Sequence, residues 1–254
     1  MAGSALRNRN FLIYLTGAAI SLHGLWIYRV AVGWFAWQLS GSEFWVGIVA
    51  FAQFAPAVVF GPLFGVLADR IHRRYASLAV NGLTTVNMIV LTVLTVTGNV
   101  NIYVLTATSL VQGMLEGAHV PIRMTLVPGL VSREELPSAI ASNSIAFNVS
   151  RLVGPALAGF IISVWGVATA FAVNGISYIG ILVAVMIIRL RPRERKTKAA
   201  SDVFSELADG VRYAASHPTI FRLFIIVAVA SVFGRGALEM LPAFADAVFG
   251  GDAS

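Results

Sequence analysis

The chain has 254 residues, of which 57% are hydrophobic and 12% are charged, with a formal net charge of +6 and no cysteine. Soluble globular domains carry about 25% charged residues, so this composition excludes an ordinary water-soluble fold. The absence of cysteine excludes disulfide bonds, thiol catalysis and Cys-ligated metals. Because apolar runs of about 20 residues can cross a bilayer as helices, the composition indicates an all-α membrane protein.

Seven apolar segments follow one another along the chain and predict membrane-spanning helices. They cover residues 11–39, 45–68, 75–96, 102–125, 136–164, 167–188 and 221–243. The polar connections divide the chain into a six-helix bundle (1–190), a basic linker (191–219) and a seventh helix with the C-terminal residues (220–254). In the linker, Val203, Leu207 and Val211 recur at helical spacing, which predicts a cytoplasmic surface helix over 202–216. Linking two bundles is the simpler role for this helix, and binding a partner is the other.

The connections alternate between uncharged and basic. Lys and Arg are absent from 40–44, 97–101 and 165–166, whereas the other side carries Arg7, Arg9, Arg70, Arg73, Arg74, Arg133, Arg189, Arg191, Arg193, Arg195, Lys196 and Lys198. By the positive-inside rule, we expect a multi-pass protein of the cell membrane with a cytoplasmic N-terminus. The same topology explains the net positive charge, so we expect no nucleic-acid binding. The first segment is too long for a cleaved signal peptide.

Charged residues inside the apolar segments are the first candidates for function, and they are Arg29, Glu116, Arg151, Arg235 and Glu239. A charge in a membrane helix costs a few kcal/mol, so each one requires a partner or a water-filled cavity. The fourth segment places four polar residues on one helix face, which we expect to face the bundle interior: Gln112, Glu116, His119 and Arg123. Two roles stay open, since Glu116 and His119 are suited to carry or relay a proton, while Glu116 is equally suited to neutralise Arg29 without titrating.

The fifth segment carries a second polar stripe, formed by Ser144, Asn148 and Arg151. It is followed by a run of small residues that includes Gly154, Pro155 and Gly159. A proline interrupts the helical hydrogen bonds, so one interpretation is a hinge or seal. Small residues also let helices approach closely, and packing is the simpler interpretation.

Other membrane positions carry weaker signals. The spacings of Gly61 with Gly65 and of Gly113 with Gly117 predict helix contacts, but such patterns are frequent in membrane helices and do not indicate a substrate. His23 is a weak candidate for a cavity residue, because a lone membrane histidine is more often a hydrogen-bonded structural group.

The sequence has none of the motifs that mark common soluble enzymes. The P-loop lysine pattern, HExxH, GxSxG and clusters with metal-ligand spacing are all missing. We therefore expect no enzyme activity, no cofactor and no metal site.

The loop between the second and third segments carries the strongest motif in the chain. It reads Gly65-Val-Leu-Ala-Asp69-Arg70-Ile-His72-Arg73-Arg74 and resembles the signature loop of the major facilitator superfamily. His72 stands where that family usually has glycine, which permits a tight turn. The resemblance implies that Asp69 helps to lock the outward-facing state by contacting the positive end of a helix in the second half. Together with Asp69, this conformational latch would comprise Gly65, Arg70, Arg73, Arg74 and Arg123. The loop arginines also enforce the topology.

Two further stretches bear on transport direction and coupling. The run from Gly154 to Gly159, preceded by Arg151, resembles a motif of the superfamily's exporters and indicates efflux. In the fourth segment, Gln112 and Gly113 match part of another superfamily motif, but Ser109 stands where that motif has arginine. Either Glu116 and His119 take the place of that arginine in proton transfer, or this chain couples transport in a different way.

A more specific resemblance is to the transmembrane secretion effector group, which includes the enterobactin exporter. It is carried by stretches over nearly the whole chain, at 24–31, 33–34, 65–74, 128–131, 134–136, 210–213 and 217–218. The resemblance implies twelve spans in two six-helix halves, with substrate bound between the halves near the midplane. This chain corresponds to the N-terminal half plus a seventh helix, so we expect it to need a missing C-terminal half or a second chain.

The resemblance implies a secondary active transporter that exports small organic molecules, siderophores or drugs, in exchange for protons. Its substrate and proton pathway would include Arg29, Gln112, Glu116, His119 and Arg151, and its partners would be the lipid bilayer, the solute and protons. The alternative is a truncated membrane remnant or interaction subunit that transports nothing.

Overall fold

The computed structural model describes residues 4–190, 212–219, 221–223 and 225–226. Its long helices are α1 (Arg9–Ser40), α2 (Glu43–Arg70), α3 (Arg73–Val96), α4 (Ile102–Leu126), α5 (Leu136–Trp165) and α6 (Val167–Ile187). Two 3₁₀ turns, η1 (Ala5–Arg7) and η2 (Val127–Gly129), precede α1 and follow α4. No strand occurs in these ranges, so the prediction of an all-helical protein is confirmed, and the helix bounds lie within two residues of the first six predicted segments.

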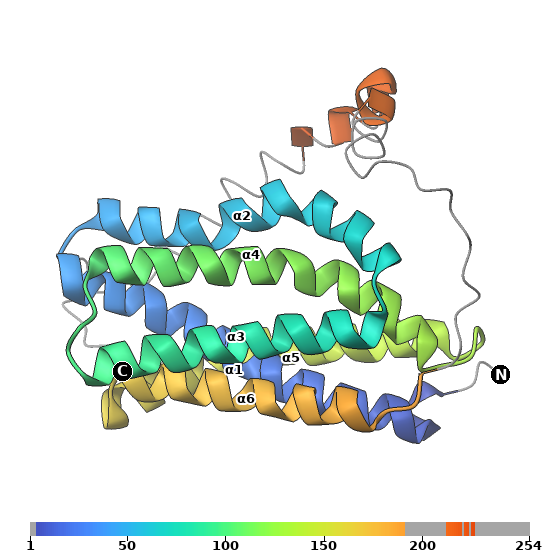
Figure 1. Ribbon diagram of the computed structural model, residues 1–254, viewed down its shortest axis with the longest axis horizontal. Helices are drawn as coiled ribbons and strands as arrows, with labels where there is room; N and C mark the ends of the chain where they lie inside the picture. Colours follow the sequence, from blue (N-terminus) through green and yellow to red (C-terminus); the bar gives the residue numbers. More distant parts are fainter. Residues whose placement is uncertain (1–3, 191–211, 220, 224, 227–254) are drawn as a thin grey trace.

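Local sequence signals set the helix ends. The Asn8 side chain accepts hydrogen bonds from the backbone N–H groups of Asn10 and Phe11 at the start of α1, and Asn101 does the same for Val104 in α4; both are helix N-caps. Gly41 ends α1 with a φ of 56°, a left-handed conformation that favours glycine. These tight ends produce short connections, so successive helices run antiparallel (Figure 1).

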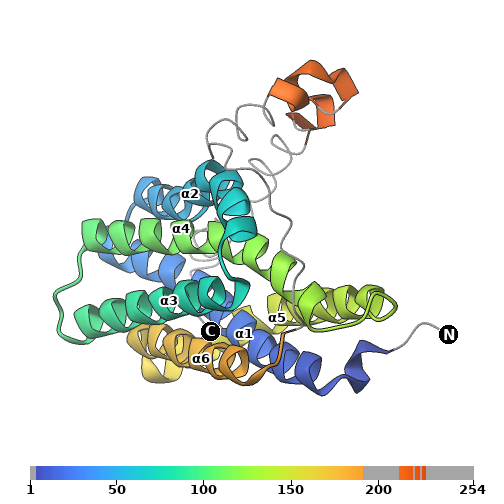
Figure 2. The same cartoon turned by 45° about the vertical axis from the view of Figure 1, so that its right-hand side comes forward.

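The six helices pack as one bundle. α2 lies along α4, α1 packs against both α5 and α6, and α3 lies between α4 and α6 (Figures 1 and 2). The contact of α4 with α2 depends on Gly113 and Gly117, because a Cβ at Gly113 would collide with the backbone carbonyl of Gln53, and one at Gly117 would lie 2.9 Å from the Ala57 Cα. The predicted helix contact through this glycine pair is therefore confirmed.

The glycine pair in α2 behaves differently. A Cβ at Gly61 or Gly65 would meet no atom within 4 Å among the described residues. The predicted contact through this pair is absent from the described part of the bundle. Glycine spacing alone does not say which face of a helix meets a neighbour, and α2 uses another face toward α4.

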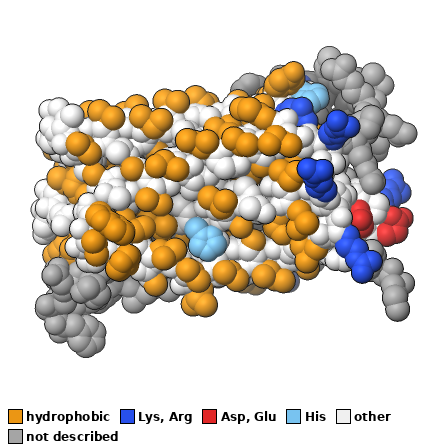
Figure 3. Space-filling view, turned by 90° about the horizontal axis from the view of Figure 1, so that it is seen from below, with side chains coloured by type: hydrophobic (Ala, Val, Ile, Leu, Met, Phe, Trp, Pro, Cys, Tyr) orange, Lys and Arg blue, Asp and Glu red, His pale blue; other side chains and the backbone are white. Residues whose placement is uncertain are grey.

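The bundle has the surface of a membrane protein. Five of its helices, α1, α2, α3, α5 and α6, are long and apolar enough to cross a membrane. Side chains on the face in Figure 3 are mostly apolar along the length of the bundle, and charged groups gather at one end. α4 falls outside the five although it has 25 residues, since its polar stripe lowers its hydropathy. It lies against α2 and α3 inside the same bundle.

Several predictions concern residues outside the described ranges. The seventh helix is described only at 221–223 and 225–226, and the surface helix only at 212–216; both stretches are helical. Arg235, Glu239 and most of the basic linker lie outside the described residues.

Candidate functional site

A network of polar side chains lies around the stripe of α4. Gln112 is almost fully buried, and Glu116, His119 and Arg123 are half-buried. The first three of these side chains contact residues of α1, α3 and α6. The predicted stripe therefore does face other helices of the bundle, where its polar groups are removed from lipid.

Glu116 is the centre of the network. Its Oε2 lies 4.0 Å from Nη2 of Arg29 on α1, and the two side chains are only 19% and 15% exposed. Its Oε1 accepts hydrogen bonds from Nε2 of Gln112 at 3.2 Å and from the hydroxyl of Tyr178 on α6 at 3.4 Å. The carboxylate is thus held by a cation and two neutral donors from three helices.

The network extends from Glu116 in two directions. Oε1 of Gln112 accepts a hydrogen bond from Nδ2 of Asn87 on α3 at 3.3 Å, and Asn87 also donates to the Thr108 carbonyl. On the other side, the His119 ring packs on the Tyr178 ring with centroids 5.7 Å apart. Nε2 of His119 lies 3.3 Å from Oγ1 of Thr84. Tyr178 therefore connects the two titratable groups, Glu116 and His119, that the sequence places on one face.

An aromatic group surrounds Arg29. Its guanidinium carbon lies 4.7 Å from the centre of the Trp26 ring and 5.3 Å from that of Phe54 on α2. Arg151 on α5 approaches the same Trp26 ring at 5.9 Å. Phe147, one turn before Arg151, packs edge-on against Trp26 at 5.8 Å. The structure thus brings together two predicted pathway arginines from different helices.

The small-residue run of α5 lies beside this aromatic group. A Cβ at Gly154 would collide with the Cβ of Trp26, so the missing side chain lets α5 approach α1. α5 continues as a helix through Pro155, and Gly159 is half-buried. This geometry favours packing over a hinge at Gly154. The polar stripe of Ser144, Asn148 and Arg151 lies on an exposed face of α5.

His23 has a structural environment. Its Nδ1 lies 2.9 Å from Oγ of Ser150 on α5 and 2.8 Å from the Ala19 carbonyl. These contacts tie α1 to α5 and agree with the structural interpretation of a lone membrane histidine. Ser109, which replaces the arginine of the family motif, is buried, and its hydroxyl has no hydrogen-bond partner among the described residues.

The signature loop lies at the charged end of the bundle. Asp69 and Arg73 line a recess of about 520 Å³ together with Gly129 and Arg133. Nearby, the guanidinium of Arg74 donates to the carbonyl of Ile188, which joins the start of α3 to the end of α6. The loop thus lies against the α4–α5 connection.

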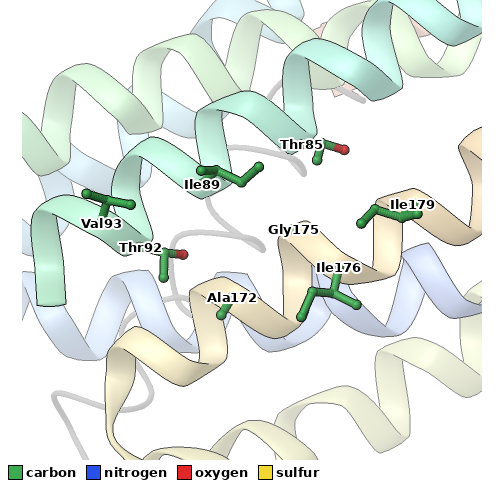
Figure 4. Close-up of a pocket in the computed structure, with 8 residues that line it drawn as sticks. All are labelled: Thr85, Ile89, Thr92, Val93, Ala172, Gly175, Ile176 and Ile179. Atoms are coloured by element: carbon green, nitrogen blue, oxygen red, sulfur yellow. The ribbon is translucent and has the colours of Figure 1, made fainter.

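A second cavity lies between α3 and α6 (Figure 4). It measures about 150 Å³ and is lined mainly by aliphatic side chains. Its two threonines, Thr85 and Thr92, donate to carbonyls of their own helix, those of Asn81 and Met88. Among the described residues, no charged side chain lines it. This cavity suits an apolar chain, and it is separate from the network around Glu116.

Sequence reasoning missed the partners that complete the site, which are Thr84, Asn87 and Tyr178, together with the packing of Trp26 and Phe54 around Arg29. A signal existed for α3, because its buried face includes Asn81, Thr84 and Asn87. Polar residues on the buried face of a membrane helix indicate hydrogen bonds between helices.

Comparisons with known proteins agree with this architecture. The chain is 24% identical to the staphyloferrin A transporter of Staphylococcus aureus, over 95% of this chain and 59% of that protein. It is 22% identical to macrolide efflux protein A of Streptococcus pyogenes, over 85% of this chain and 54% of that protein. The chain therefore spans between half and three-fifths of these relatives.

A solved structure has the same fold. It is a bacterial homologue of the human lysosomal transporter Spinster in an inward-facing, unoccupied conformation, with a TM-score of 0.73 at 13% identity, over 97% of this chain and 57% of that one. The model of the transmembrane secretion effector family matches residues 2–254. The chain belongs to the transmembrane secretion effectors, a family of the major facilitator superfamily.

Proposed function

We propose that this chain forms one wall of a secondary active transporter that exports small organic molecules in exchange for protons. The observation that carries the proposal is the Glu116 carboxylate, held midway along the bundle by Arg29, Gln112 and Tyr178. An ionisable residue inside a membrane protein is by default a candidate for an ion or substrate pathway. The names of the relatives, a siderophore transporter and a macrolide efflux protein, support a siderophore-like or drug-like solute.

The network supports a simple coupling scheme. Proton binding to Glu116 removes the charge that faces Arg29 and breaks the ion pair. Loss of the proton restores the ion pair. His119 lies near Glu116, since both residues contact Tyr178, and it is our candidate for proton exchange with water. Arg29, Gln112, Glu116, His119 and Arg151 then form the substrate and proton pathway.

The rest of the proposal concerns assembly and conformational control. Asp69 acts as a latch with Gly65, Arg70, Arg73, Arg74 and Arg123 when a second six-helix half packs on this one. That half comes from further residues of the same polypeptide or from a second chain. The protein lies in the cell membrane with its N-terminus in the cytoplasm, in line with the charged end of the bundle.

Transport by energised vesicles tests this proposal. Export of a fluorescent dye or a labelled siderophore is measured for this chain alone and together with a candidate second half, each with and without an uncoupler. We expect uncoupler-sensitive export in at least one arrangement, and a loss of tenfold or more (about 1.4 kcal/mol or more) in Glu116→Gln. Glu43→Gln is the matched control, because Glu43 is an exposed residue in the first turn of α2.

Two outcomes contradict the proposal. Normal proton-driven export by Glu116→Gln would remove Glu116 from the coupling step. Absence of transport in every arrangement, for both dye and siderophore, would favour a membrane protein that only binds partners.

A further inference from the structure

Two arginines from different helices share one indole ring. The guanidinium carbons of Arg29 on α1 and Arg151 on α5 lie 4.7 and 5.9 Å from the centre of the Trp26 ring. Both distances are within the range of cation–π attraction. Two like charges around one ring also repel each other. The arrangement therefore concentrates positive charge on a small aromatic surface.

The negative charge near this surface balances only one of the arginines. Arg29 pairs with Glu116 at 4.0 Å. Among the described residues, no Asp or Glu forms an ion pair with Arg151. One positive charge is left in excess when Glu116 is ionised, and two are left when Glu116 is protonated.

The position of Arg151 along its helix makes this excess costly. It lies close to the middle of α5, which spans Leu136–Trp165. At 1.5 Å per residue, each end of the helix is roughly 22 Å away. An arginine near a helix end can reach the membrane surface, but one at this depth requires an anion or a water-filled cavity. Arg151 is exposed in the described bundle, so it is accessible to a ligand.

The ring itself adds features of a binding surface. Nε1 of Trp26 is buried and has no hydrogen-bond partner among the described residues. Buried polar groups are seldom left without a partner. Phe54 and Phe147 flank the same region. The surface thus combines two guanidinium groups with aromatic walls, and the buried N–H beneath it is a donor that the described residues leave unused.

We propose that Trp26, Arg29 and Arg151 form a subsite for the carboxylate groups of an aromatic or similarly flat organic anion. Guanidinium groups bind carboxylates through paired, charge-assisted hydrogen bonds, and the rings pack against the flat part of the ligand. This inference rests on the proposed function, because it names the substrate class of that transporter.

Equilibrium binding tests the subsite without transport. The full chain is placed in lipid nanodiscs, and isophthalate, which has two carboxylates on an aromatic ring, is titrated by calorimetry. Dimethyl isophthalate is the uncharged counterpart. We expect isophthalate to bind and the ester to bind at least tenfold more weakly. Arg151→Gln and Trp26→Leu should each weaken isophthalate binding at least tenfold, while Arg151→Lys, which keeps the charge, should lose less than Arg151→Gln.

Arg9→Gln is the matched control, since it removes an arginine at the start of α1, far along the helix from Trp26. Its binding should be unchanged. Equal binding of isophthalate and its ester, no binding of isophthalate, or unchanged binding in Arg151→Gln would each overturn the inference. Proton-driven export with no isophthalate binding would leave the proposed function standing without this substrate class. Binding with no export of any solute would support the subsite and contradict the proposed function.

Discussion

The hydroxyl of Tyr178 donates a hydrogen bond to Oε1 of Glu116 across 62 residues of sequence, at 3.4 Å. The same ring packs on His119. Tyr178 therefore joins the carboxylate and the imidazole of the network, one through its hydroxyl and the other through its ring. Because the two contacts use different parts of the side chain, a substitution can remove the hydroxyl and keep the ring.

Tyr178→Phe should reduce uncoupler-sensitive export several-fold and leave the fold intact. The substitution keeps the ring on His119 but removes one of the donors to Glu116, a loss of about 1 kcal/mol. Export from energised vesicles and the thermal unfolding midpoint are the two measurements. Tyr103→Phe is the control, because Tyr103 is exposed and packs on Trp45, away from Glu116. Equal export by both variants would show that the hydroxyl has no part in coupling.

The two membrane histidines of the bundle should respond differently to the same substitution. His119→Gln should lower proton-driven export by about tenfold, the equivalent of 1.4 kcal/mol, because glutamine keeps a polar group near Thr84 but cannot exchange a proton. His23→Gln should mainly lower the unfolding midpoint, since His23 contacts Ser150 and ties α1 to α5. Proton-driven export at the normal rate in His119→Gln would exclude His119 from the proton pathway.

Two glycine substitutions test the packing of α4 on α2. Gly113→Ala should destabilise the bundle by about 1–3 kcal/mol, because its Cβ would collide with the Gln53 carbonyl. Gly61→Ala should be neutral or slightly stabilising, since no described residue lies within 4 Å of the Cβ position at Gly61 and alanine favours helix. Thermal unfolding in detergent compares the two variants. Similar midpoints would contradict the close α2–α4 contact.

Single cysteines can establish the orientation, because the natural chain has none. We expect Asn99→Cys, in the exposed connection between α3 and α4, to react with an impermeant maleimide in intact cells. Glu134→Cys, in the connection between α4 and α5, should react only after permeabilisation. The reverse pattern would place the N-terminus outside.

The sequence predicted the six described helices well because each is an apolar run with clear end signals. Asn8 and Asn101 cap helices, and Gly41 ends one. Helical spacing also placed Gln112, Glu116 and His119 on one face. These features depend on neighbours within a few turns of the chain, which a single sequence displays directly.

The rest of the site depends on which helix faces meet. Tyr178 lies in a strongly apolar helix, and nothing in its local sequence links it to Glu116. Asn87 is similar, since its contact with Gln112 depends on how α3 rotates against α4. Gly61 and Gly65 show the converse, because they have the spacing typical of a helix contact, yet no described residue lies within 4 Å of either Cβ position. Periodicity gives the faces of a helix but does not assign a neighbour to each face.

The fit of Trp26 into the space above Gly154 has a consequence for motion. The Trp26 side chain occupies the space that a side chain at Gly154 would fill. For this reason α1 and α5 cannot slide along each other by a helical turn without first separating. The contact between His23 and Ser150 joins α1 to α5 about one helical turn from Trp26 and Gly154. A rearrangement of the bundle that moves α1 is therefore expected to carry α5 with it.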